Sequence, residues 1–292
     1  MFGKLRLYTD FVVLKHTLFA IPFAYLGAFL ASRGVPELGI LFWVGLAFLG
    51  ARSAAMALNN LVDKDIDARN PRTAGRELPT GRIKLWEVWG IILVSYFLLF
   101  YSSYKLNWLC LLLAPVIPLT SVIYPYLKRF TPVPHFVLGL NLGYAPVGGW
   151  LAVRGAIDYP FGAPELAMLL LLLAVTFWVA GFDIIYSLLD LDFDRKNRLY
   201  SVPSFFGVKN ALLLSFASHV LMLVFLIGLM YVLDLGVIFK AGLVIIAALI
   251  LYEHTLVKAD NFMNIPVAFF NVNAAVSLSM LFFTAADVLL LT

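Results

Sequence analysis

Long apolar runs separated by short polar segments dominate the pattern of the chain. Nine runs approach or exceed 20 residues, about the length that a helix needs to cross the hydrocarbon core of a bilayer. They cover about residues 12–32, 38–60, 87–105, 107–127, 135–153, 164–189, 211–233, 236–257 and 265–291. Backbone groups in lipid must be hydrogen-bonded within their own segment, so these runs predict helices rather than open strands. Pro22, Pro115, Pro118 and Pro146 lie inside the runs and are expected to kink or break them.

Composition supports the same fold class. The 292 residues are 62% hydrophobic and 13% charged, whereas soluble domains are about 45–50% apolar and about 25% charged. We therefore expect an all-α polytopic membrane protein that is surrounded by membrane lipid, with no nucleic-acid partner. Cys110 is the single cysteine, which excludes an internal disulfide and a cysteine metal cage.

The distribution of charge predicts the orientation. The net charge is +4, and 16 of the 21 Lys and Arg residues lie before or at the start of the first run or in the segments that follow even-numbered runs. Basic residues concentrate on the cytoplasmic side of membrane proteins. The pattern predicts a multi-pass protein of the plasma membrane, with the N-terminus and the long basic loops in the cytoplasm and the C-terminus outside.

Two acidic motifs interrupt this apolar chain. They read "NNLVDKDIDARN" (59–70) and "DIIYSLLDLDFDRKN" (183–197), and each ends an even-numbered run. A shift of 127 positions places Asp63, Asp65 and Asp67 on Asp190, Asp192 and Asp194. This correspondence predicts a single domain over residues 1–292 with two related halves, about 10–130 and 135–260, followed by a final helix.

Helical periodicity divides the acids into two groups. Two sets are predicted to share a helix face: Asn59, Asp63 and Asp67 in the first motif, and Asp183, Tyr186, Asp190 and Asp194 in the second. Asp65 and Asp192 point elsewhere and are expected to face water. The plainer interpretation, that the acids only mark where helices leave the membrane, explains those two but not Asp183, which lies inside an apolar run. Ionisable groups at membrane depth are costly and usually functional.

The residue types favour a particular ligand. Carboxylates without His or Cys partners suit Mg²⁺, which takes one or two of them and completes its shell with water and substrate phosphates. Arg and Lys in the adjoining loops suit a phosphate group. A diphosphate head with an apolar tail in the helix bundle, such as an isoprenyl diphosphate, satisfies both conditions. Aromatic faces can stabilise the allylic cation that departure of diphosphate leaves, provided that water is excluded.

At these motifs the sequence resembles the UbiA superfamily of intramembrane prenyltransferases. "NNLVDKDID" is similar to the family's NDxxDxxxD motif, with Asn60 in place of the first Asp, and "DIIYSLLDLDFD" is similar to its DxxYxxxDxxxD motif. The similarity extends to "KHTLFAIPFAYLGA", "RNPRTAGRELPTGRI", "YPYLKR" and "RLYSVPSFFG" and covers most of residues 11–210. It implies nine helices around a central cavity, cytoplasmic loops that cap the active site, and two Mg²⁺ ions between the motifs.

The resemblance also implies roles for individual residues. The expected Mg²⁺–diphosphate ligands are Asn59, Asp63, Asp67, Asp190 and Asp194, of which the four aspartates are the expected catalytic residues. The expected diphosphate-binding residues are Arg72, Arg76 and Lys128, with Asp183 and Tyr186 lining the same part of the cavity. His16 matches a position that contacts the acceptor, although a hydrogen-bonded histidine at the membrane interface is the alternative. Asn60 lies off the metal-facing stripe, so its departure from the motif is mild.

Arg52 is the residue that gives information about the acceptor. It lies seven residues before Asn59, on the same face and deeper in the membrane, where it needs an anionic partner. That partner is either the carboxylate of an aromatic acceptor or an acidic residue such as Asp183. The resemblance is greatest to the branch that prenylates hydroxybenzoate or dihydroxynaphthoate in quinone synthesis, including its menaquinone-pathway members.

The sequence thus predicts Mg²⁺-dependent transfer of a prenyl group from geranyl diphosphate or a longer donor to an aromatic hydroxy acid. The alternatives are a UbiA-type enzyme that acts on a glycerol-phosphate ether lipid, and a transporter or cation carrier with intramembrane carboxylates. A phospholipid-headgroup transferase is disfavoured because the chain lacks a DGxxAR motif. The sequence does not determine the prenyl chain length or the oligomeric state.

Overall fold

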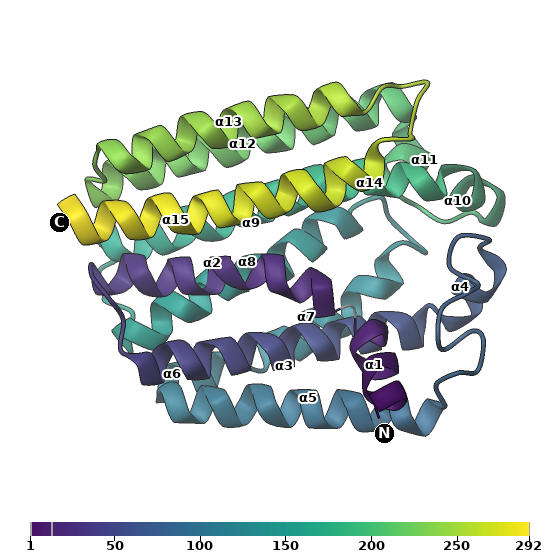
Figure 1. Ribbon diagram of the computed structural model, residues 1–292, viewed down its shortest axis with the longest axis horizontal. Helices are drawn as coiled ribbons and strands as arrows, with labels where there is room; N and C mark the ends of the chain where they lie inside the picture. Colours follow the sequence, from purple (N-terminus) through teal and green to yellow (C-terminus); the bar gives the residue numbers. More distant parts are fainter. Residues whose placement is uncertain (1, 13, 292) are drawn as a thin grey trace.

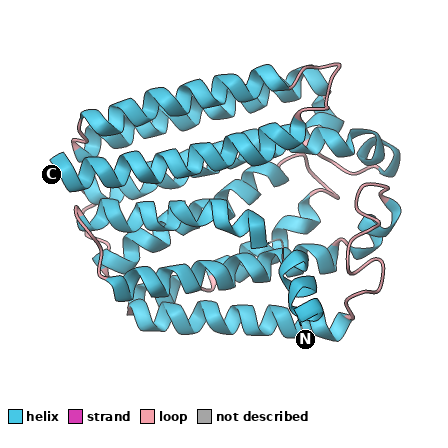
Figure 2. Ribbon diagram, viewed as in Figure 1, coloured by secondary structure: helices cyan, strands magenta, loops and turns pink. Residues whose placement is uncertain are grey.

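The chain folds into a bundle of helices that run along the longest axis of the molecule (Figure 1). The computed structural model describes residues 2–12 and 14–291, and no strand is assigned within them. Loops lie at the two ends of the bundle (Figure 2), as expected where apolar runs alternate with short polar segments. The all-helical fold class predicted from the sequence is therefore confirmed.

The bundle is built from long helices that pack mainly on neighbours in a ring. They are α2 (Leu14–Ser32), α3 (Leu38–Val62), α5 (Leu85–Leu106), α8 (Pro134–Arg154), α9 (Ala163–Ser187), α12 (Val208–Leu233), α13 (Val237–Leu256) and α15 (Asn273–Leu291). Helix α5 packs on α3, α8 lies against both α2 and α9, and α12 packs on α9. Helix α15 contacts both α13 and α2, which closes the ring.

Eight described segments are long and apolar enough to cross a membrane, one fewer than the nine that the sequence predicted. The difference concerns the first run, where the described apolar part of α2 is Ala20–Ser32. The side chains of residues 13–19 are outside the described part of the chain, so the count of eight does not include this run. The other eight runs correspond to the eight segments.

Proline has different effects in different runs. The fourth run is divided into α6 (Trp108–Leu113) and α7 (Val116–Leu127), with Pro115 as the residue that precedes α7. The predicted break at Pro115 is therefore confirmed. Helices α2 and α8 continue through Pro22 and Pro146 without interruption.

Short helices gather at one end of the bundle, on the right of Figure 1, while the C-terminus lies at the other end. They are α1 (Phe2–Phe11), α4 (Lys64–Arg69), η1 (Leu188–Asp190), α10 (Leu191–Asn197) and α11 (Val202–Phe206). Asp63 (φ −92°, ψ 3°) and Asp190 (φ −105°, ψ 5°) each precede the first residue of a short helix, α4 and α10. Each acidic motif thus turns at one aspartate, Asp63 or Asp190, rather than continuing as one straight helix.

Close helix packing and a helical irregularity shape the interior. A Cβ atom on Gly149 of α8 would lie 1.9 Å from the carbonyl oxygen of Ala24, so α8 and α2 touch there backbone to backbone. Before α15, the chain forms the short helix α14 (Ile265–Val267) and a π-helical turn, η2 (Ala268–Val272). The turn η2 packs against α9, and it brings Phe269 to the central cavity.

Candidate active site

A cavity of about 530 Å³ lies inside the bundle. Its lining comes from α2, α3, α5 to α9 and η2, and it includes the acidic motifs at the end where the short helices gather. Farther along the bundle the lining becomes apolar, with Val44, Phe48, Leu106 and Cys110. The cavity thus offers a charged mouth and an apolar interior to a ligand of matching polarity.

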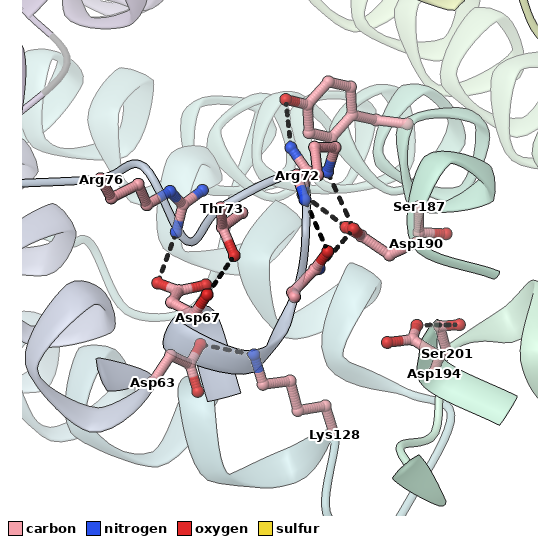
Figure 3. Close-up of polar contacts among 12 residues, drawn as sticks. Asp63, Asp67, Arg72, Thr73, Arg76, Lys128, Ser187, Asp190, Asp194 and Ser201 are labelled. Atoms are coloured by element: carbon pink, nitrogen blue, oxygen red, sulfur yellow. Dashed lines mark hydrogen bonds and ion pairs between the residues drawn. The ribbon is translucent and has the colours of Figure 1, made fainter. Parts of the chain in front are cut away.

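The first acidic motif is held by basic residues (Figure 3). The ammonium of Lys128 lies 2.5 Å from Oδ2 of Asp63, and a guanidinium N–H of Arg76 donates to Oδ2 of Asp67 over 2.7 Å. The Thr73 hydroxyl donates to the backbone carbonyl of Asp67. Asp63 and Asp67 are both buried, so these contacts supply the opposite charge that buried carboxylates require.

The second motif is hydrogen-bonded to the end of the first motif and to the loop that follows it. Asn70 donates to Oδ1 of Asp190 over 2.7 Å, and Arg72 pairs with both carboxylate oxygens of Asp190. The same guanidinium donates to the Tyr186 hydroxyl over 3.1 Å, while Asp194 accepts from the Ser201 hydroxyl. Figure 3 shows Arg72 paired with Asp190, so residues about 120 positions apart form one site.

Two charged groups at the mouth have shifted proton affinities. Burial raises the pKa of Asp63 above the ordinary value of an aspartate, and the charge and hydrogen bond of Lys128 oppose this shift. Burial alone would lower the pKa of Arg72, but the hydrogen bond and the charge of Asp190 outweigh it and raise the pKa overall. A further cation beside Asp63 would favour its ionised form.

Aromatic side chains form much of the wall next to the acids. Tyr186 and Phe269 have ring centroids 4.1 Å apart, and the Arg72 guanidinium carbon lies 5.2 Å from the Tyr186 centroid. Phe182 meets Phe269 edge to face at 5.3 Å. The structure thereby identifies aromatic residues around the cavity that composition alone did not distinguish from ordinary packing.

Arg52 lies in the cavity with part of its guanidinium unsatisfied. Its Nε is buried and has no hydrogen-bond partner, and no ion pair is found for it among the described residues. Asp183, the protein partner considered from the sequence, pairs with His135 instead, 2.7 Å from Oδ2 to Nδ1. Of the two partners considered for Arg52, the pair with Asp183 is not formed.

The structure brings the predicted site residues together around one cavity. All of them whose side chains are described line it, namely Arg52, Asn59, Asp63, Asp67, Arg72, Arg76, Lys128, Asp183, Tyr186, Asp190 and Asp194. His16 falls in the stretch 13–19, outside the residues whose side chains are described. Asp65 and Asp192 are exposed, as the helical periodicity predicted. Asn60 turns away from the cavity and donates to the carbonyl of Phe11.

Several polar residues of the site were not identified from the sequence. Asn70 and Ser201 hold Asp190 and Asp194 of the second motif, and both lie in short polar segments with many equivalent residues. Asn141 lines the cavity from the apolar helix α8, and its buried Oδ1 has no partner. Asn141 could have been identified from the sequence, because it is an amide in the middle of an apolar run. His135 belongs to no sequence pattern that distinguishes it from a structural histidine.

The donor set at the mouth fits Mg²⁺. It consists of oxygen atoms, and Oδ1 of Asp63 is buried without a hydrogen-bond partner. In the described part of the chain, no three His, Cys, Asp or Glu residues are close enough to form a complete protein cage for a metal. Such an incomplete oxygen set suits an ion that retains waters and takes its remaining ligands from substrate phosphates.

Comparison with known proteins then decides the family. A model of the UbiA prenyltransferase family matches residues 20–283. The chain belongs to the UbiA prenyltransferase family. This protein is therefore an enzyme, a prenyltransferase of the membrane, and the transporter alternative is set aside.

Individual members support this assignment. The UbiA chain is 30% identical over 231 residues to a 4-hydroxybenzoate octaprenyltransferase of Aeromonas salmonicida (strain A449), covering 78% of this chain and 76% of the relative. The apo structure of a UbiA homologue from Aeropyrum pernix K1 matches with a TM-score of 0.83 and 36% identity, over 94% of this chain and 98% of that one.

A more distant structure shares the UbiA fold. It is a homologue from Archaeoglobus fulgidus bound to GPP and Mg²⁺, with a TM-score of 0.70 and 20% identity, covering 96% of this chain and 99% of that chain. At this identity the likeness establishes the common fold.

Proposed function

We propose that this protein catalyses the Mg²⁺-dependent transfer of a prenyl group from an isoprenyl diphosphate to an aromatic hydroxy acid of the 4-hydroxybenzoate or dihydroxynaphthoate type, in quinone synthesis. The observation that carries the proposal is the joint placement of both acidic motifs, their basic partners and an unpaired Arg52 on one cavity. The relative named 4-hydroxybenzoate octaprenyltransferase supports this choice of acceptor.

The diphosphate end of the donor belongs at the charged mouth. Asp63 and Asp67 would hold one of two Mg²⁺ ions together with Asn59, and Asp190 and Asp194 would hold the other. When bound, Mg²⁺ neutralises the charge that builds up on the departing diphosphate. With metal at the acids, Arg72, Arg76 and Lys128 would be free to bind phosphate oxygens.

The prenyl tail belongs in the apolar interior. Val44, Phe48 and Leu106 line that part of the cavity and exclude water from the hydrocarbon chain. The Tyr186 and Phe269 rings line the cavity beside Arg72, where their faces can stabilise the positive charge on the allylic carbon. Exclusion of water there prevents hydrolysis of the cation before the acceptor attacks.

The acceptor carboxylate belongs at Arg52. A guanidinium in a membrane interior without an acidic partner has a strong preference for an anion. A carboxylate at Arg52 would fix one end of an aromatic ring and leave the opposite end near the acidic motifs. In this arrangement the active site faces the cytoplasm of the plasma membrane, the side to which the basic loops are assigned by charge.

Two measurements test the proposal. Binding of geranyl diphosphate to the purified protein, measured by calorimetry with and without Mg²⁺, should require the metal. Product analysis with 4-hydroxybenzoate, dihydroxynaphthoate and a glycerol-phosphate ether lipid should then give a prenylated aromatic acid. Donor binding that is equal without metal would contradict the Mg²⁺ role, and turnover of the ether lipid alone would replace the aromatic acceptor.

A further inference from the structure

His135 is a buried histidine with both ring nitrogens in hydrogen bonds. It lies in the first turn of α8 and is 4% exposed. Its Nδ1 is 2.7 Å from Oδ2 of Asp183 on α9, and its Nε2 is 3.2 Å from the backbone nitrogen of Val202 at the start of α11. Three helices therefore meet at this one imidazole ring.

These partners select one form of the ring. The Val202 N–H can only donate, so Nε2 must carry the free lone pair and no hydrogen. A neutral imidazole then has its hydrogen on Nδ1, which donates to the carboxylate of Asp183. An imidazolium would carry hydrogen on both nitrogens and would place two donors against each other at Val202.

Only one oxygen of the Asp183 carboxylate is therefore hydrogen-bonded. Oδ2 accepts from His135, whereas no hydrogen bond to Oδ1 is found among the described residues. The side chain is 18% exposed and lines the cavity. Arg52 and Tyr124, which also line the cavity, are close enough to Asp183 to interact with its charge.

We propose that His135 is a positioning residue whose Nδ1–H form holds Asp183 with Oδ1 turned to the acceptor hydroxyl. This inference rests on the proposed function, because it requires an acceptor that carries a hydroxyl. Arg52 would bind the carboxylate end of that acceptor and Asp183 its hydroxyl end. The pair would therefore favour an aromatic acid with its hydroxyl remote from the carboxylate.

The proton balance follows from this placement. As the ring carbon bonds to C1 of the prenyl group, the C1–O bond to diphosphate breaks and the hydroxyl proton passes to Oδ1 of Asp183. The hydrogen of the attacked ring carbon then passes to a diphosphate oxygen, and Asp183 returns its proton to the product hydroxyl. One C–H and one C–O bond are exchanged for one C–C and one O–H bond, and no oxidant or reductant is needed.

Nitrogen NMR tests the tautomer directly. In ¹⁵N-histidine-labelled protein, His135 should give one protonated nitrogen, Nδ1, and one bare nitrogen, Nε2, with the signals assigned by their loss in His135→Asn. Val202→Pro removes the N–H at the first position of α11, where proline is tolerated, and should release this preference. An Nε2–H or doubly protonated His135 in the unaltered protein would overturn the proposal.

Kinetics test the positioning role. His135→Leu should lower kcat for prenyl transfer roughly 10- to 100-fold, a loss like that seen when a group that orients a metal ligand is removed. Mg²⁺-dependent binding of geranyl diphosphate should remain unchanged, and His135→Asn, whose amide can still donate to Asp183, should recover part of the rate. Equal losses of kcat and donor binding would indicate a structural role and contradict the proposal.

A matched control separates the outcomes. His219 is also fully buried with both ring nitrogens bonded, to His254 and to the Trp178 carbonyl, and it does not line the cavity. His219→Leu should leave the kcat of the correctly folded protein unchanged. If the unaltered protein prenylates no aromatic hydroxy acid, the proposed function fails, whereas the tautomer of His135 is still decided by its NMR spectrum.

Discussion

Three acids of the site each have a cation of their own. Asp63 pairs with Lys128, Asp67 with Arg76, and Asp190 with Arg72. Several carboxylates in one partly buried place repel each other and lose hydration, so each needs an opposite charge when no metal is present. The same cations are the groups expected to bind diphosphate, which gives them one partner before the donor arrives and another afterwards.

Removal of a single acid should therefore stop catalysis without unfolding the bundle. Asp63→Ala and Asp190→Ala each delete a proposed metal ligand, and we expect activity to fall by more than about 100-fold, beyond the usual loss for a supporting residue. Asp65→Ala is the matched control, because Asp65 is exposed and lies outside the cavity. Normal activity in both acid variants, in protein that purifies as usual, would refute the two-metal site.

Replacement of Arg52 should change the KM for the acceptor and not the KM for the prenyl donor. Arg52→Ala removes the unpaired guanidinium, and an ionic hydrogen bond worth about 1.5–3 kcal/mol corresponds to roughly a 10- to 100-fold higher KM for the acceptor. The KM for the prenyl donor should change little. Steady-state kinetics with each substrate varied in turn measures both, and equal increases would indicate that Arg52 supports the cavity as a whole.

Site residues that recur with helical periodicity were predictable from the sequence. Asn59, Asp63 and Asp67 recur every four positions, and all three line the cavity. His135 and Asn70 could not be found in this way, because their importance comes from contacts with residues 48 and 120 positions away. A lone polar residue carries no periodic signal, and only the packing of helices reveals its partner.

At the scale of the elements, α8 packs closely against two neighbouring helices, α2 and α9. Small residues allow helices in membranes to approach closely, and Gly149 and Gly139 bring α8 against Ala24 of α2 and Thr176 of α9. These contacts hold α8 beside the cavity, with Asn141 and His135 among its lining residues. The close approach of backbones therefore contributes directly to the position of the site.

A methyl group at Gly149 should destabilise the bundle. Gly149→Ala would place a Cβ atom 1.9 Å from a backbone oxygen, and overpacking of this kind costs about 1–3 kcal/mol. We expect a lower midpoint of thermal unfolding in detergent. Gly90→Ala on α5 is the control, since a Cβ there meets nothing within 4 Å, and it should leave the midpoint unchanged or slightly higher.

The elements themselves were predictable to different degrees. Apolar runs locate the eight spans because membrane helices need a minimum apolar length, and Pro115 marks a break because proline lacks the N–H that a helix interior requires. The π-helical turn η2 carries no such signal. Asn273 donates there to the carbonyls of Ala268 and Phe269 and accepts from the Trp178 indole, contacts that depend on the assembled bundle.

At the scale of the whole molecule, the two ends of the bundle differ in character. One end carries the short helices and the mouth of the cavity, and the other carries the C-terminus (Figure 1). If the basic loops face the cytoplasm, Asp65 and Asp158 lie on opposite sides of the membrane. Both side chains belong to exposed residues, which makes them accessible to labelling reagents.

Cysteine labelling should report this orientation. In a Cys110→Ala background, which removes the single native thiol, Asp158→Cys should react with a membrane-impermeant maleimide in intact cells. Asp65→Cys should react only after the membrane is permeabilised. The reverse pattern would place the active site on the outer face and would contradict the orientation predicted from charge.

The graded lining of the cavity, charged at one end and apolar at the other, has a consequence for the direction of the reaction. Cleavage of a prenyl diphosphate makes one product that belongs in water and one that belongs in lipid. Diphosphate leaves through the charged mouth and is diluted in three dimensions, whereas the prenylated ring remains confined to the plane of the membrane. The two products therefore part into different phases as soon as they form, and their re-encounter, which the reverse reaction needs, becomes a rare event.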